Sequence, residues 1–132
     1  MEIEVIFQLF LAIFLGALIG LEREYKKKGA GLQTFSLVTL GSCLFTLLSL
    51  QFPNFSPIYI AIAIGFLGAG VIFQQSSGVV GLTTAAALWV SAAIGSAIGL
   101  KLYFFLAIFS TLLTTLILTG FGLFEAKFLK KG

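Results

Sequence analysis

The residues that could do chemistry gather after the first long apolar run, where Glu22, Arg23 and Glu24 precede Lys26–Lys28. Carboxylates beside basic side chains can form ion pairs, cap a helix start or border an anion site. The 132-residue chain has five acidic residues, all of them Glu, no His and one Cys, Cys43. This inventory excludes the usual metal sites and Ser-His-Asp triads. We find no nucleophile–base pair and no cofactor motif, so we expect neither an enzyme nor a bound metal.

The elements that must position these residues are apolar. Hydrophobic residues make up 59% of the chain, charged residues only 10%, and the mean hydropathy is +1.13. An average soluble domain has about 25% charged residues, so this composition excludes a soluble enzyme, a disordered tail and a nucleic-acid-binding module. A spanning helix needs about 20 apolar residues. The sequence predicts one transmembrane domain over 1–132, with five spans at about 5–21, 34–52, 58–73, 82–100 and 102–124.

The fold class expected from these runs is an all-α integral membrane protein. A spanning β-barrel would need alternating apolar and polar residues, whereas these runs are continuously apolar. Basic residues favour the cytoplasmic side. They cluster in the loop after the first run and in the tail, at Lys127, Lys130 and Lys131, while only Lys101 falls on the other side. We therefore predict that the N-terminus lies outside and the C-terminus in the cytoplasm. The acidic flank before the first run argues against a signal peptide.

Two short patterns recur in the sequence. Phe14–Ala17 and Phe66–Ala69 are both Phe-Leu-Gly-Ala, and Gly31–Thr34 resembles Gly81–Thr84. One interpretation is a parallel repeat in which the first two helices correspond to the third and fourth, with the fifth helix peripheral. The other is chance recurrence of small apolar residues. Both interpretations remain open.

Small residues also recur four positions apart, which places them on one face of a helix. The three stripes are Ala12, Gly16 and Gly20; Ala61, Gly65 and Ala69; and Ala87, Ser91, Gly95 and Gly99. Lipid chains are as apolar as Leu, so close packing must hold membrane helices together. We therefore expect the first, third and fourth helices to form the core. Packing within one protomer is favoured over a homo-oligomer interface, which stays the alternative.

Helix starts offer a second kind of polar site. Thr34 and Thr83 or Thr84 stand where the second and fourth helices are expected to begin, and Thr can cap a helix N-terminus. Both starts face the side that carries Glu22 and Glu24. We expect Glu22 to stabilise one of these helix starts. Anion binding at the same place is the less favoured alternative.

Together these segments resemble the MgtC/SapB/YhiD family of bacterial membrane proteins. The matching stretches are Gly16–Tyr25, Ala30–Thr34, Gly65–Ile72, Gly81–Ala86, Trp89 and Ala92–Gly95. The resemblance implies a multi-pass inner-membrane protein with five spans, linked to growth at low magnesium and, in pathogens, to virulence and survival inside macrophages. For MgtC-type members it implies regulation of other membrane proteins, including the F-type ATP synthase. The motif positions it singles out here are Glu22, Arg23, Gly31, Thr34, Gly65, Gly68, Gly70, Gly81, Thr83, Thr84 and Trp89.

The sequence departs from the family pattern at two positions, and it is also shorter than MgtC-type members. Gln33 and Val80 stand where the family has Arg, so roles of those Arg side chains do not transfer. The layout resembles the short form without the MgtC-type cytoplasmic C-terminal domain. We expect a non-enzymatic regulator that contacts the bilayer and other membrane proteins, with no cofactor and no nucleic acid partner. The alternative is a small oligomeric channel or transporter for Mg²⁺ or another ion.

Overall fold

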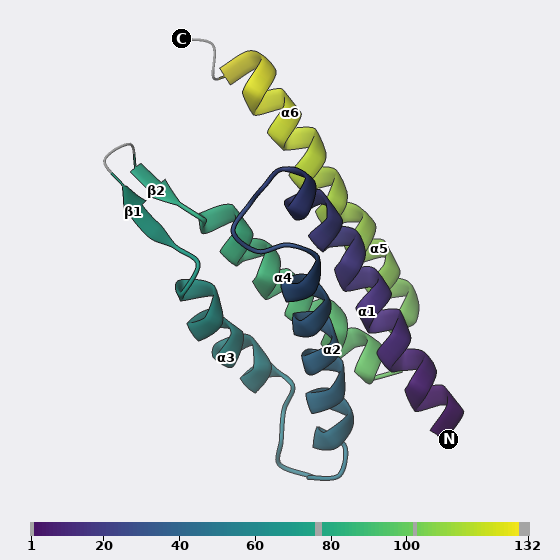
Figure 1. The fold of residues 1–132 in the computed structure, drawn as a ribbon. Helices are drawn as coiled ribbons and strands as arrows, with labels where there is room; N and C mark the ends of the chain where they lie inside the picture. Colours follow the sequence, from purple (N-terminus) through teal and green to yellow (C-terminus); the bar gives the residue numbers. More distant parts are fainter. Residues whose placement is uncertain (1, 76–77, 102, 130–132) are drawn as a thin grey trace.

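The computed structural model describes residues 2–75, 78–101 and 103–129, which are almost entirely helical (Figure 1). The helices are α1 (Glu2–Tyr25), α2 (Leu32–Ser49), α3 (Ile58–Ala69), α4 (Leu82–Gly99), α5 (Phe104–Leu116) and the short α6 (Gly122–Phe124). Two π-helical segments, η1 (Ile117–Phe121) and η2 (Glu125–Leu129), continue the last helix, so Phe104–Leu129 forms one rod. Lys130, Lys131 and Leu102, which belong to the predicted tail and fifth span, lie outside the described residues.

Four of these helices are long and apolar enough to cross a membrane: α1, α2, α4 and the Phe104–Leu129 rod. Their composition points to a membrane protein, as the apolar runs predict. The third helix differs from the expected span at 58–73, because α3 has only 12 residues. At about 1.5 Å per residue it is about 18 Å long, whereas a hydrocarbon core is about 30 Å thick.

A short β-hairpin follows α3 where a helical span and a loop were expected. Strand β1 (Phe73–Gln75) pairs antiparallel with β2 (Gly78–Val80), and Phe73 lies opposite Val80. Ser76 and Ser77, in the predicted third loop, are not among the described residues. Figure 1 shows the hairpin projecting beyond the bundle at the end where α4 begins. The helix gives way near Gly68 and Gly70, which have low helix propensity.

Helix α2, rather than α3, lies at the centre of the bundle. It packs along both α1 and α4, while α3 packs mainly against α4. The glycines explain this arrangement, because a Cβ on Gly20 would lie 2.8 Å from the Gly31 carbonyl oxygen and one on Gly99 would lie 2.8 Å from Thr46 Cβ. The small faces of α1 and α4 therefore both receive α2, and the predicted core of the first, third and fourth helices is wrong.

The rod after Tyr103 is not peripheral, because α5 packs on both α1 and α4. Ala107 and Thr111 are buried at this contact. The Thr111 hydroxyl donates to the Ala107 carbonyl one turn earlier, 2.8 Å away. Such a bond within one helix lets a polar side chain enter an apolar contact without an unpaired donor. Helix α5 thus supports the side of α1 that carries the charged residues.

Candidate functional site

Three charged side chains form a compact cluster at the end of α1. Because α1 continues to Tyr25, Glu22 and Lys26 lie one turn apart on the same face. Arg23 Nε lies 2.7 Å from one carboxylate oxygen of Glu22, and Lys26 Nζ lies 2.7 Å from the other. Arg23 is only 3% exposed and Glu22 is also buried. Each buried charge therefore has an opposite charge in contact, which buried ions require.

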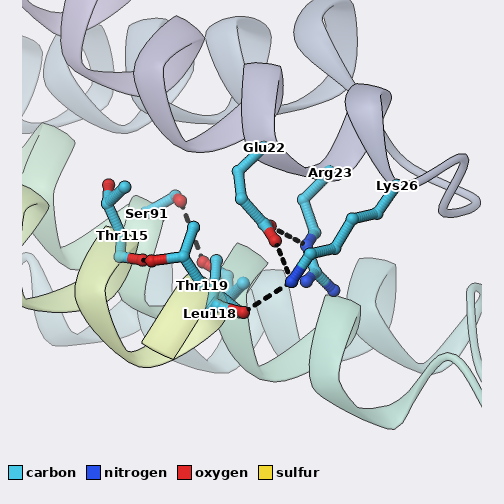
Figure 2. Close-up of polar contacts among 8 residues, drawn as sticks. Glu22, Arg23, Lys26, Ser91, Thr115, Leu118 and Thr119 are labelled. Atoms are coloured by element: carbon cyan, nitrogen blue, oxygen red, sulfur yellow. Dashed lines mark hydrogen bonds and ion pairs between the residues drawn. The ribbon is translucent and has the colours of Figure 1, made fainter. Parts of the chain in front are cut away.

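Lys26 also joins α1 to the π-helical segment of the rod. Its Nζ donates a hydrogen bond of 2.8 Å to the Leu118 carbonyl oxygen. A π turn interrupts the regular α-helical bonding pattern, and such segments are frequent at functional sites. Gly122 gives the ammonium room, because a Cβ at that position would lie 2.8 Å from Lys26 Nζ. Figure 2 shows the cluster between α1 and the rod, with Leu118 at its edge.

Hydroxyl groups of α4, α5 and η1 lie beside this cluster in the same view (Figure 2). Ser91 donates to the Ala87 carbonyl at 2.8 Å, and Thr119 donates to the Thr115 carbonyl at 2.7 Å. Each of these hydroxyls thus has its donor satisfied by a carbonyl of its own helix. The surroundings of the cluster are therefore polar without adding further charge.

The start of α2 is held by Glu24, not by Glu22. The Leu32 backbone N–H donates to Glu24 Oε2 at 3.2 Å, and Gly31 is the N-cap residue. Gly31 has no side chain because a Cβ there would collide with the Glu24 carboxylate. Our expectation that Glu22 serves this purpose is wrong, since its carboxylate is already engaged by two basic side chains.

The threonines expected as caps are also displaced. The N-cap residues are Gly31 for α2 and Gly81 for α4, and neither has a side chain that could form a capping bond of its own. Gly81 has φ +88°, a left-handed conformation that favours glycine, and a Cβ there would collide with the Val71 carbonyl. Thr84 is buried inside the first turn of α4, whereas Thr83 is exposed. The turn into α4 thus depends on glycine geometry, so the Gly81 position matters for a backbone reason.

The predicted motif residues fall into separate regions. Glu22, Arg23 and the helix starts at Gly31 and Gly81 share one end of the bundle, while Thr34 is half-buried in the first turn of α2. Gly68 is buried, with the position of its missing Cβ 3.6 Å from Ala85 Cβ. Gly65 and Gly70 are exposed. Trp89 is 55% exposed and borders a groove of about 480 Å³ between α3, α4 and α5, so it does not pack into the core.

The three small-residue stripes are also placed differently from one another. Ala12, Gly16 and Gly20 face α2, and Gly95 and Gly99 meet α2 from the other side, with Ala87 and Ser91 buried on the same helix. The stripe on α3 turns outward instead. Ala69 and Gly65 are exposed, Ala61 is half-buried, and a Cβ on Gly65 would meet nothing within 4 Å.

Sequence reasoning missed the polar residues that pair with main-chain atoms far away. In the sequence Lys26 is part of a basic run, which gives no sign that its acceptor is a carbonyl 92 residues later. Gln8 donates to the Ile98 carbonyl at 2.8 Å. Gln8 is the only strongly polar residue of the first apolar run, and that isolation was the available signal. Among the described residues no three His, Cys, Asp or Glu side chains form a group that could hold a metal.

The comparisons with known proteins match this arrangement to one family. A model of the MgtC family matches residues 9–127, which cover α1 through most of the rod. This chain belongs to the MgtC family. Protein SrpB of Synechococcus elongatus is 41% identical over 134 aligned positions, which cover 87% of this chain and 73% of SrpB. No solved structure matches the chain.

Two further relatives are longer than this family member. YhiD of Escherichia coli K12, described as a candidate magnesium transporter, is 41% identical over 92% of this chain and 62% of its own length. Protein MgtC of Salmonella typhimurium is 48% identical over 72% of this chain and 43% of its own length. The chain thus spans between about half and three quarters of the curated relatives it matches. Activities of the longer proteins are therefore proposals for this chain.

Proposed function

We propose that this chain is a non-enzymatic regulator in the bacterial inner membrane that acts by contacting other membrane proteins during adaptation to low magnesium. The observation that carries the proposal is the closed centre of the bundle. At Gly16, Gly20, Gly95 and Gly99 the neighbouring helix is so close that even a methyl group would collide. A protomer packed this tightly leaves its outer surface as the place for function.

The charge distribution supports the same proposal. Within the described spans, the buried ionised side chains are those at the end of α1, and they neutralise one another. An ion path usually places a charged residue near the middle of the membrane. The cluster fits better as a clamp between α1 and the rod, because Lys26 contacts both Glu22 and the Leu118 carbonyl.

The surface for a partner is the side of the bundle around α3. Helix α3 exposes its small-residue stripe, and Trp89 borders the groove beside it. Small residues let another membrane helix approach closely, and Trp is frequent at the centres of protein interfaces. By family resemblance the F-type ATP synthase is the first partner to test. The orientation with the N-terminus outside, and the repeat of α1–α2 in α3–α4, are parts of this proposal.

Copurification tests the proposal. Tagged protein from cells grown at low magnesium should bring down the same membrane partner repeatedly. Replacing Trp89 with Ala should reduce recovery severalfold, whereas the same change at Phe105, which is 81% exposed on α5, should not. Equal recovery with both variants, or repeated recovery of no membrane protein, would contradict the proposal.

A small oligomeric channel or transporter is the second candidate. The observation that favours it is the outward stripe of α3, since Ala61, Gly65 and Ala69 have the four-residue spacing that lets identical helices associate. An oligomer could form a path between protomers that one protomer lacks. Magnesium flux into proteoliposomes would support this candidate if Gly65→Leu abolished it. Flux equal to that of empty liposomes would remove it.

A further inference from the structure

An apolar groove separates α3 from α2. Helix α3 packs on α4 and makes almost no contact with α2, although α2 and α3 are consecutive in the chain. The groove between them has a volume of about 650 Å³. Its walls include Leu37, Gly41 and Phe45 of α2 and Ile60, Ile64 and Leu67 of α3. A Cβ on Gly41 would meet nothing within 4 Å, so the α2 wall is open at its centre.

The length of the groove matches the depth of one membrane leaflet. Its residues on α2 run from Thr34, in the first turn, to Phe45. At 1.5 Å per residue this stretch is about 17 Å long, close to half of a hydrocarbon core of about 30 Å. Phe55 and Tyr59 border the deeper end, where their rings meet edge to face with centroids 5.6 Å apart. The groove is therefore bounded by aromatic rings at its inner end.

Between Thr34 at one end and Tyr59 at the other, the groove is lined by hydrocarbon. Ser42 is the polar residue of that stretch, but it lies against α4, because a Cβ on Gly95 would be 2.9 Å from Ser42 Cβ. The Ser42 hydroxyl oxygen is buried and is not exposed to the groove. Polar groups without partners are costly inside a membrane, so such walls favour an occupant that is hydrocarbon along its length.

We propose that this groove holds one acyl chain of an anionic phospholipid from the adjoining leaflet. A methylene group takes about the volume of a liquid water molecule, about 30 Å³, so the groove has room for about 20 methylene groups. A membrane helix about 10–12 Å wide and 17 Å long would occupy about 1,300 Å³ or more, roughly twice the volume of the groove. The lipid chain thus supplies the contact with α2 that α3 lacks.

Basic residues at the outer end of the groove fit the headgroup of such a lipid. Lys27 and Lys28 are exposed in the short connection that enters α2. Lysines near a membrane surface attract anionic headgroups. The Glu24 carboxylate at this end is engaged by the Leu32 N–H. The lipid phosphate therefore lies beside Lys27 and Lys28, while the chain runs between α2 and α3.

Binding of a defined lipid tests the proposal. The full chain, freed of lipid in uncharged detergent, is titrated with dioleoyl phosphatidylglycerol, and native mass spectrometry counts the bound lipids. We expect saturable binding of one lipid, and Gly41→Leu should abolish it, because the new side chain fills the groove. Gly65→Leu is the matched control and should keep the lipid, since Gly65 is exposed on α3 outside the groove and a Cβ there also meets nothing within 4 Å.

The headgroup has its own matched pair. Lys28→Gln should weaken binding severalfold, whereas Lys101→Gln, with the same change of charge at the other end of the bundle, should not. Dioleoyl phosphatidylcholine, which has the same chains and no net charge, should also bind severalfold more weakly.

The proposal is independent of the regulatory role proposed above, so each can fail alone. Helical circular dichroism checks that each variant is folded, and Ala63→Phe, on the α3 wall of the groove, replaces Gly41→Leu if that variant does not fold. The absence of saturable lipid binding, or equal losses from Gly41→Leu and Gly65→Leu, would overturn the proposal. So would a dimer that Gly41→Leu dissociates, because the occupant would then be a second copy of the chain.

Discussion

Replacing Gly20 with Ala is the most direct test of the packing between α1 and α2. The new methyl group would lie 2.8 Å from the Gly31 carbonyl oxygen and 2.9 Å from Leu32 Cα. Both are backbone atoms at the start of α2, so neither can rotate away. The helices must separate or bend to accept the change, and we expect a loss of stability despite the higher helix propensity of Ala.

The magnitude follows from two terms. Overpacking a tight contact costs about 1–3 kcal/mol. The Gly-to-Ala gain in helix propensity is about 1 kcal/mol in water. In an SDS titration the separated helices remain helical, so that gain largely cancels and the contact term remains. Because the opposing atoms at Gly20 are backbone, we expect a cost of about 2 kcal/mol.

Gly41 provides the matched control. It lies in the middle of α2, and a Cβ there would meet nothing within 4 Å. Gly41→Ala should change the free energy of unfolding by less than about 0.5 kcal/mol, as expected for a site away from tight contacts. Both variants are measured by unfolding in mixed micelles with increasing SDS, followed by the fluorescence of Trp89, the one Trp of the chain. If Gly20→Ala were no less stable than Gly41→Ala, the close approach of α1 and α2 would be refuted.

Three further outcomes follow from polar contacts. Lys26→Met should lower the free energy of unfolding by about 2 kcal/mol, because it leaves the buried Glu22 carboxylate without one partner; this cost is smaller than for a fully buried ion pair because Lys26 is partly exposed. Amide exchange around Leu118 should also become faster, and unchanged exchange there would argue against the clamp. Glu24→Ala should cost about 1 kcal/mol as a lost helix cap, while Glu24→Gln keeps an acceptor for the Leu32 N–H and should lose less; equal losses would indicate a purely electrostatic role. Thr39→Val should cost about 0.6 kcal/mol, because the Thr39 hydroxyl bonds the α1 backbone, and Thr39→Ser should restore most of it; SDS titration measures both.

The apolar runs predicted the membrane-protein class well because hydropathy and length depend on local composition. Four long helices fall close to the predicted ranges. The hairpin was not predictable in this way, because hydropathy identifies the polar residues after Phe73 only as the end of a span and not as paired strands. Helix α3 ends near Gly68 and Gly70, whereas α4 remains helical through Gly95. The effect of a glycine on a helix therefore depends on its surroundings, which the sequence does not give.

Packing partners were harder to predict than helices. A stripe of small residues shows which face can be approached closely, but not which helix approaches. The stripes of α1 and α4 both turned out to receive α2, whose contact face carries Thr39, Ser42 and Thr46. Hydroxyl-bearing residues can pack closely and bond a neighbouring backbone, as Thr39 does with the Ala12 carbonyl at 2.6 Å. A search for Gly and Ala alone therefore misses the central helix.

The partners of the charged side chains at the end of α1 were also not predictable from the sequence. The sequence places Glu22 and Glu24 on the same side of the membrane and leads to the expectation that Glu22 stabilises a helix start. The helix geometry separates them, because Glu22 faces Arg23 and Lys26 while Glu24 faces the start of α2. One turn of α1 thus fastens two neighbours, α2 through Glu24 and the rod through Lys26. Glu22, Arg23 and Lys26 are therefore engaged with one another and with the rod, so the charges of this cluster act in the packing of the bundle.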